Sequence, residues 1–90
     1  MNKFDLGKIV ATPGALEALE ASGQSPAFFL DRHVCGDWGE VGAEDKLLND
    51  EALVSGERLL SAYKTLLGTR IWIISEADRS STTILLPSEY

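Results

Sequence analysis

The chain has 90 residues, 44% of them hydrophobic, with a formal net charge of −6, one cysteine and one histidine. This length suits a single domain over residues 1–90, and the apolar fraction supports a core. The acidic balance argues against direct binding to nucleic acid, which requires a basic face. One cysteine cannot form an internal disulfide, and no apolar run reaches the roughly 20 residues of a membrane span or forms a secretion leader. We therefore expect a cytoplasmic protein that contacts no membrane.

The first half of the sequence predicts one short strand followed by two to three helices. Residues 7–11 form a short apolar run that is typical of a strand. Two helix starts follow, each a hydroxyl N-cap before a proline, at Thr12–Pro13 and Ser25–Pro26. Glycines end these two helices, at Gly23 and Gly36. A third helix is expected from about Ala43 to Ser55, with Leu47, Leu48, Ala52 and Leu53 as its apolar positions.

After Gly56 the apolar period changes from about 3.6 to 2, which indicates strands. Three strands are predicted, at residues 57–64, 69–77 and 82–87, with turns at 65–68 and 78–81. Connections this short join antiparallel neighbours, so the three strands should form a meander. Because the helices precede these strands, the predicted class is α+β, with the helices packed on one face of a small antiparallel sheet.

The stretch RHVCGDWGEVGAED, residues 32–45, contains the only histidine, the only cysteine and a tryptophan. A zinc site needs three or four ligands, and the chain offers no second histidine or cysteine, so we expect no metal and no cofactor. His33 and Cys35 lie two residues apart near a helix end and diverge, which disfavours a nucleophile pair. We expect a protonated His33, favoured by the helix C-terminus, and a buried Cys35.

Acidic residues crowd the same region and its continuation: Asp37, Glu40, Glu44, Asp45, Asp50, Glu51 and Glu57, with Lys46 as the lone basic residue. They form either a solvated surface or a patch for a basic partner, including a nucleic-acid-binding protein. Trp38 is either an anchor that holds the loop to the core or an exposed contact for a partner. The predicted partner-binding set is Asp37, Trp38, Glu40, Glu44, Asp45 and Arg79.

Residues 75–87, SEADRSSTTILLP, concentrate polar groups at a strand–turn–strand junction. Ordinary turn chemistry accounts for them, but Arg79 could also bind an anion or a partner carboxylate. If this turn meets the 33–38 loop, then His33, Asp37 and Arg79 would form a weak catalytic or ligand-binding set. A further alternative is a homodimer paired through an edge or apolar face of residues 69–86. The C-terminal LLPSEY is either a clasp or a recognition tail.

Several segments together carry a family resemblance: GKIVATPGALEAL, HVCGDWGEV, LNDEAL, SAYK and, most specifically, IWIISEADRSSTTILLPSEY. They resemble a family of short bacterial proteins found on plasmids and other mobile genetic elements. The resemblance covers nearly the whole chain and implies a mobile-element context, without an activity or a fold. Together with the acidic region, it leads us to predict a small non-enzymatic interaction protein. Such a protein could inhibit a host defence system by binding a basic surface that normally holds nucleic acid.

Overall fold

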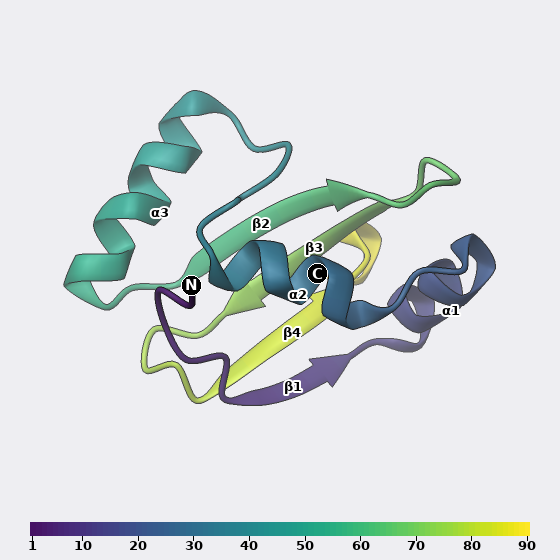
Figure 1. The fold of residues 1–90 in the computed structure, drawn as a ribbon, viewed down its shortest axis with the longest axis horizontal. Helices are drawn as coiled ribbons and strands as arrows, with labels where there is room; N and C mark the ends of the chain where they lie inside the picture. Colours follow the sequence, from purple (N-terminus) through teal and green to yellow (C-terminus); the bar gives the residue numbers. More distant parts are fainter.

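The computed structural model describes residues 1–90 and has the α+β class that the sequence predicts (Figure 1). Its elements in chain order are β1 (Lys8–Ala11), α1 (Pro13–Ser22), α2 (Pro26–Val34), α3 (Ala43–Ser55), β2 (Leu59–Lys64), β3 (Arg70–Ser75), β4 (Ser81–Leu85) and a 3-10 turn η1 (Pro87–Glu89). None of the three helices has the length and apolarity needed to cross a membrane.

The helix ends follow from local chemistry. The Thr12 hydroxyl accepts a hydrogen bond from the Ala15 amide at 3.2 Å and caps α1, as predicted. Gly23 ends α1 in the left-handed region, with φ of +68°. The predicted cap of α2 is only half right, because Ser25 has extended backbone but makes no side-chain capping bond. The proline that follows it still begins the helix, since its fixed φ suits the first helical position.

The sheet is four-stranded and mixed, with the order β1-β4-β3-β2, which corrects the predicted three-stranded antiparallel meander. Strands β2, β3 and β4 do pair in antiparallel fashion along the chain. Strand β1 adds a fourth strand parallel to β4, with Ile9 opposite Thr82. A parallel pair needs a long crossover, and the three helices with β2 and β3 provide it. Strand periodicity identifies β1 but does not reveal a partner so distant in sequence.

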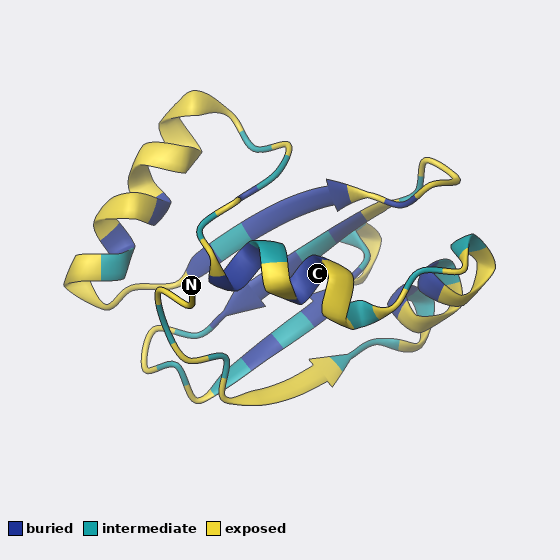
Figure 2. Ribbon diagram, in the orientation of Figure 1, coloured by how far each residue is buried: buried dark blue, intermediate teal, exposed yellow.

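Helices α1 and α2 cover one face of the sheet and form the main core with it (Figure 1). This core consists of Ala15, Leu19, Phe29, Leu30, Tyr63, Ile71, Ile73 and Ile84. Helix α3 lies beside β2 instead, and most of its surface is exposed (Figure 2). The expectation that all helices pack on one face is therefore wrong for α3. No α-helix lies on the opposite face of the sheet, where the ring of Tyr90 packs at 5.7 Å from that of Trp72.

Candidate functional site

Residues 38–40, which belong to the stretch 32–45 described above, pair with the outer edge of β2. The Ala62 amide donates to the carbonyl of Trp38 at 3.0 Å, and the Ala62 carbonyl accepts from the Glu40 amide at 2.6 Å. Further along the same edge, the buried Asn49 side chain of α3 forms the pair of hydrogen bonds that a neighbouring strand would form. Its Oδ1 accepts from the Leu60 amide at 3.1 Å, and its Nδ2 donates to the Leu60 carbonyl at 2.8 Å. These bonds satisfy backbone groups that an edge strand would leave unpaired.

Trp38 points inward, with only 3% of its surface exposed. Its ring stacks on Phe4 at a centroid distance of 6.3 Å, and its Nε1 donates to Asp50 Oδ1 at 3.0 Å. The neighbouring Gly39 has φ of +76°, and a Cβ there would collide with the Ala62 carbonyl and the Tyr63 ring. Of the two interpretations of Trp38, the anchor is confirmed. Its ring offers no surface to a partner, which removes Trp38 from the predicted partner-binding set.

His33 is completely buried and sits in a chain of hydroxyl groups. Its Nδ1 lies 2.5 Å from Ser61 Oγ, and its Nε2 lies 2.9 Å from Ser75 Oγ. Ser75 Oγ is 2.7 Å from Thr82 Oγ1, and the Thr82 hydroxyl donates to the Leu6 carbonyl at 2.7 Å. Because Thr82 donates to a carbonyl, it must accept from Ser75, which in turn accepts from His33. The network therefore requires a proton on Nε2, and in the neutral ring Nδ1 accepts from Ser61.

Burial keeps His33 neutral near pH 7, which corrects the expectation of a protonated ring at the helix end. Burial, together with the smaller effect of the positive charge of Arg79, lowers the pKa of His33 from 6.5 to about 4. Phe4 and Trp38 enclose the ring with edge contacts at centroid distances of 5.2 Å and 5.6 Å. Both ring nitrogens are occupied, so His33 joins the N-terminal segment, α2 and the sheet rather than meeting a substrate.

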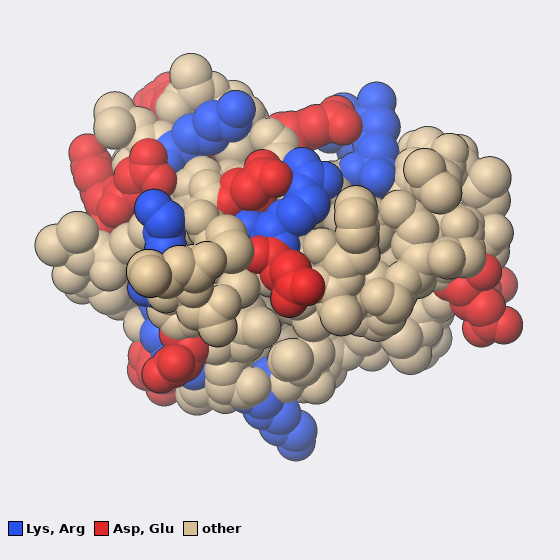
Figure 3. Space-filling model, viewed as in Figure 1, with Lys and Arg blue, Asp and Glu red and all other residues tan.

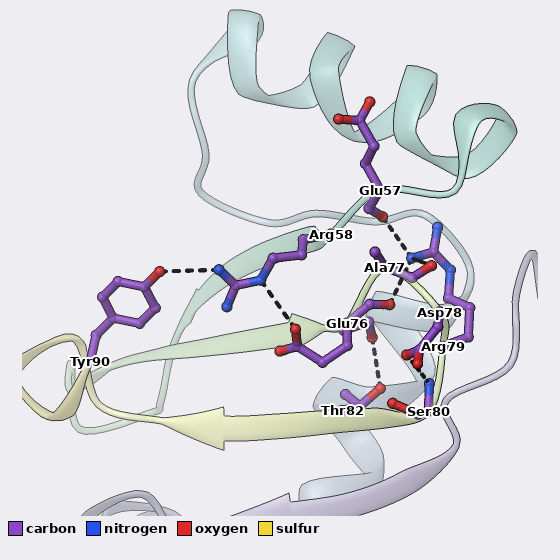
Figure 4. A network of polar contacts seen from close by, with 10 residues as sticks. Glu57, Arg58, Glu76, Ala77, Asp78, Arg79, Ser80, Thr82 and Tyr90 are labelled. Atoms are coloured by element: carbon purple, nitrogen blue, oxygen red, sulfur yellow. Dashed lines mark hydrogen bonds and ion pairs between the residues drawn. The ribbon is translucent and has the colours of Figure 1, made fainter.

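Arg79 binds backbone carbonyls rather than an anion (Figure 4). Its Nη1 donates to the carbonyls of Glu57 at 2.6 Å and Glu76 at 2.9 Å, with a longer bond to that of Ala77. Its Nη2 donates to the carbonyl of Ala52 at 3.0 Å. The guanidinium thus caps the C-terminal end of α3 and ties it to the turn before β4. The backbone of Arg79 is in the left-handed region, with φ of +60°. Because both terminal nitrogens of Arg79 already donate to carbonyls, little of its hydrogen-bonding capacity remains for a partner.

Two of the predicted acidic contacts are already paired. Asp37 Oδ2 accepts from Arg32 Nε at 2.8 Å, and this hydrogen bond holds the pKa of Asp37 below its usual value. Glu40 Oε1 lies 3.8 Å from Lys64 Nζ. The pairs are half exposed, so they stabilise the fold little. They nevertheless neutralise much of the charge that these two carboxylates would offer to a basic partner.

The weak catalytic set therefore does not assemble around a cavity. His33 is buried in its hydroxyl chain, Asp37 pairs with Arg32, and Arg79 caps α3. The one pocket in the structure lies elsewhere, against Trp72 and Tyr90. No three acidic, histidine or cysteine side chains gather as they would around a metal ion. Cys35 is exposed rather than buried, because α2 ends at Val34 and the thiol projects from the helix end.

Several acidic side chains without an ion pair lie on α3, in the region where Figure 3 shows carboxylates at the surface. Glu44 and Asp45 occupy its first turn, where they also favour the helix N-terminus. Leu47 and Val54, two turns apart, are 60% and 91% exposed, whereas Ala52 is buried. Of the four apolar positions, Leu47 and Leu48 are exposed, because α3 contacts the sheet through Asn49, Ala52 and the half-buried Leu53.

We call Glu44, Leu47, Glu51 and Val54 the outward face of α3. Helical spacing places these four residues on the side opposite Asn49. The spacing of seven between Leu47 and Val54 is visible in the sequence, but it looks like a core stripe until the contacts of Asn49 are known.

Comparisons with protein-family models, curated proteins and solved structures find no match for this chain. The surface geometry therefore carries the functional argument.

Proposed function

We propose that the protein is a non-enzymatic interaction module that binds a basic, partly apolar protein surface through the outward face of α3. The observation that carries this proposal is the combination of exposed Leu47 and Val54 with Glu44 and Glu51, neither of which has an ion pair. An amphipathic helix that lays apolar side chains into a partner's groove is a common mode of recognition. The flanking carboxylates would select a basic groove.

The arrangement of charge supports a protein partner rather than a small molecule. The carboxylates of α3 are spread over a convex helix and do not converge on a cavity. Such a surface attracts a basic partner over a distance of about one Debye length, near 8–10 Å at physiological salt. It accelerates association and discourages acidic competitors, while the apolar side chains stabilise the final contact.

The partner class that fits this surface best is a protein whose basic surface normally holds nucleic acid. Such surfaces carry clustered lysine and arginine side chains that contact phosphates, and carboxylates on a helix can occupy the same positions. The resemblance to mobile-element proteins would make the partner a host protein. In this proposal, the protein inhibits a host defence system by competing with nucleic acid.

Photo-crosslinking tests this proposal directly. A photoreactive residue at Val54 should capture a protein through its basic surface, whereas the same residue at Ala21, exposed on α1, should not. The Glu44→Lys/Glu51→Lys variant should lose the complex, and added salt should weaken it. The captured protein should release bound oligonucleotide when this protein is added. Equal capture from Val54 and Ala21, or no loss in the double variant, would contradict the proposal.

A further inference from the structure

A pocket of about 270 Å³ opens on the sheet face that lies opposite α1 and α2. Leu60 and Ile74 are directly opposite each other on β2 and β3, and Trp72 is two residues from Ile74 on the same face. These side chains alternate along the strands with Tyr63 and Ile73 of the main core, which places them on the other side of the sheet. The residues that line the pocket are Arg58, Leu59, Leu60, Trp72, Ile74 and Tyr90.

The pocket is a local opening rather than part of a broad apolar surface. Ala62 and Leu85 lie on the same face, but each is only 5% exposed. A stable protein partner would need about 800 Å² of contact on this chain, which this face does not offer in apolar form. A small molecule needs only the pocket. Because an apolar cavity of about 150 Å³ can hold benzene, a pocket of this volume admits a molecule with two fused rings.

Two aromatic side chains form the walls of the pocket. The rings of Trp72 and Tyr90 meet edge to face, with their centroids 5.7 Å apart. Trp72 is half-buried and Tyr90 is exposed, so both rings still present surface to an incoming molecule. Aromatic rings attract one another in stacked or edge-to-face geometry beyond the area that they bury. The walls therefore favour a flat aromatic occupant over an aliphatic one.

The Tyr90 wall is held in place by its neighbour. The carboxylate of Glu89 accepts from the Thr12 hydroxyl at 2.5 Å, from the Gly14 amide at 3.2 Å and from the Leu86 amide at 2.8 Å. These bonds fasten the turn η1 to the start of α1 and fix the backbone next to Tyr90. The pocket is therefore formed before an occupant arrives, which lowers the entropy that binding would cost.

The polar rim of the pocket is balanced in charge but retains a free donor. Figure 4 shows Arg58 between Tyr90 and Glu76. Arg58 Nε lies 3.5 Å from Glu76 Oε1, and Arg58 Nη1 donates to the Tyr90 hydroxyl at 3.3 Å. The carboxylate of Glu76 offsets the guanidinium charge, so an occupant gains little from a charge of its own. The second terminal nitrogen of Arg58, Nη2, makes no hydrogen bond within the chain and can donate to an acceptor.

We propose that this pocket binds an uncharged, flat, two-ring aromatic molecule that carries one hydrogen-bond acceptor. Its rings lie against Trp72 and Tyr90 and cover Leu60 and Ile74, and its acceptor faces Arg58. An apolar pocket with a few polar groups at its rim is the usual form of a small-molecule site. None of its lining residues belongs to the outward face of α3, so the proposal is independent of the proposed function.

An NMR titration with quinoline at pH 7.5 tests the proposal, because quinoline is uncharged there and its ring nitrogen is an acceptor. The indole N–H signal of Trp72 should shift and saturate with a Kd below about 1 mM. The indole N–H of Trp38, which is buried and donates to Asp50, should not move and serves as the internal control.

Three variants and two related probes sharpen the test. Leu60→Phe should bind quinoline at least about tenfold more weakly, because the added ring fills the pocket. Tyr90→Ala, a change at an exposed side chain, should weaken binding by about twofold to tenfold. Val10→Phe, which adds a ring to an exposed strand residue outside the pocket, should bind as the wild type does. N-methylquinolinium, a cation without an acceptor, should bind at least about tenfold more weakly than quinoline, and quinoline-4-carboxylate should bind within about threefold of it.

The opposite results overturn the proposal. A Trp72 signal that does not move, or that shifts without saturating, shows that the pocket is not a binding site. Equal binding by Tyr90→Ala and the wild type places quinoline elsewhere, even if Leu60→Phe fails to fold. Much tighter binding of the carboxylate, or undiminished binding of the cation, contradicts the uncharged class of ligand. None of these results affects the crosslinking from Val54.

Discussion

Acidification should destabilise the protein through His33 well before its carboxylates titrate. The imidazole is fully buried, and its pKa is lowered from 6.5 to about 4 by burial and by Arg79. Above pH 6.5 the ring is neutral in both the folded and unfolded states, and the hydroxyl network contributes in full. As the pH falls from 6.5 towards 4, the unfolded chain takes up a proton that the folded chain does not. Stability is therefore lost across that window.

The size of the stability loss follows from the shift in the pKa of His33. A difference of about 2.5 pKa units, at 1.36 kcal/mol per unit, gives about 3 kcal/mol in total. Roughly 2 kcal/mol of this should already be lost at pH 5, where most carboxylates are still ionised. For a domain of this size, with a free energy of unfolding near 5–10 kcal/mol, that loss is large. The window between pH 5 and 6.5 isolates His33, because it is the only histidine.

Urea unfolding at several pH values measures this loss, with tryptophan fluorescence as the probe because Trp38 contacts His33. A His33→Gln variant should be less stable at pH 7.5 but should show almost no change in stability between pH 6.5 and 5. The histidine ring protons, followed by NMR, should titrate near pH 4 in the folded protein. A midpoint at pH 6 or above, or an equal pH dependence in the wild type and the variant, would refute the argument.

Three other substitutions test the contacts that hold α3 and residues 38–40 to the rest of the fold. Asn49→Ala should cost about 2–3 kcal/mol in urea unfolding and speed hydrogen exchange at the Leu60 amide, because it leaves two backbone groups of the strand unpaired. Gly39→Ala should cost at least about 2 kcal/mol, since its Cβ meets backbone at positive φ, whereas Gly42→Ala, with open space around it, should change stability by less than about 1 kcal/mol. Arg79→Lys should cost about 1–2 kcal/mol and expose the last turn of α3 to exchange, and 10 mM phosphate should leave the wild-type Tm unchanged if the guanidinium serves carbonyls rather than an anion.

The local elements could be predicted because their signals are local. The third helix is found at 43–55 as expected, bounded by Gly42 and Gly56. The turn at 65–68 forms with Gly68 at φ of +85°. These features depend on residues a few positions apart, whose capping and turn chemistry is independent of the rest of the chain.

The long-range features could not be predicted, and they changed the candidate site most. The pairing of β1 with β4 depends on residues about 70 positions apart. The neutral state of His33 depends on its burial against β2, β3 and β4, whose hydroxyls are far from it in sequence. Asn49 looks like a surface residue of an acidic helix, and only its bonds to Leu60 show that it turns Leu47 outward. Periodicity identifies an apolar stripe but does not say which element covers it.

Both edges of the sheet are poorly suited to strand addition, which directs attention to α3. One edge is paired with the Trp38–Glu40 segment and with Asn49, so no free strand could add there. The other edge is β1, which has only four residues and begins with Lys8, features that discourage strand addition. Neither edge therefore favours the addition of a strand from a partner. The outward face of α3 remains exposed, with Leu47 at 60% and Val54 at 91%, and this is the surface that the proposed function uses.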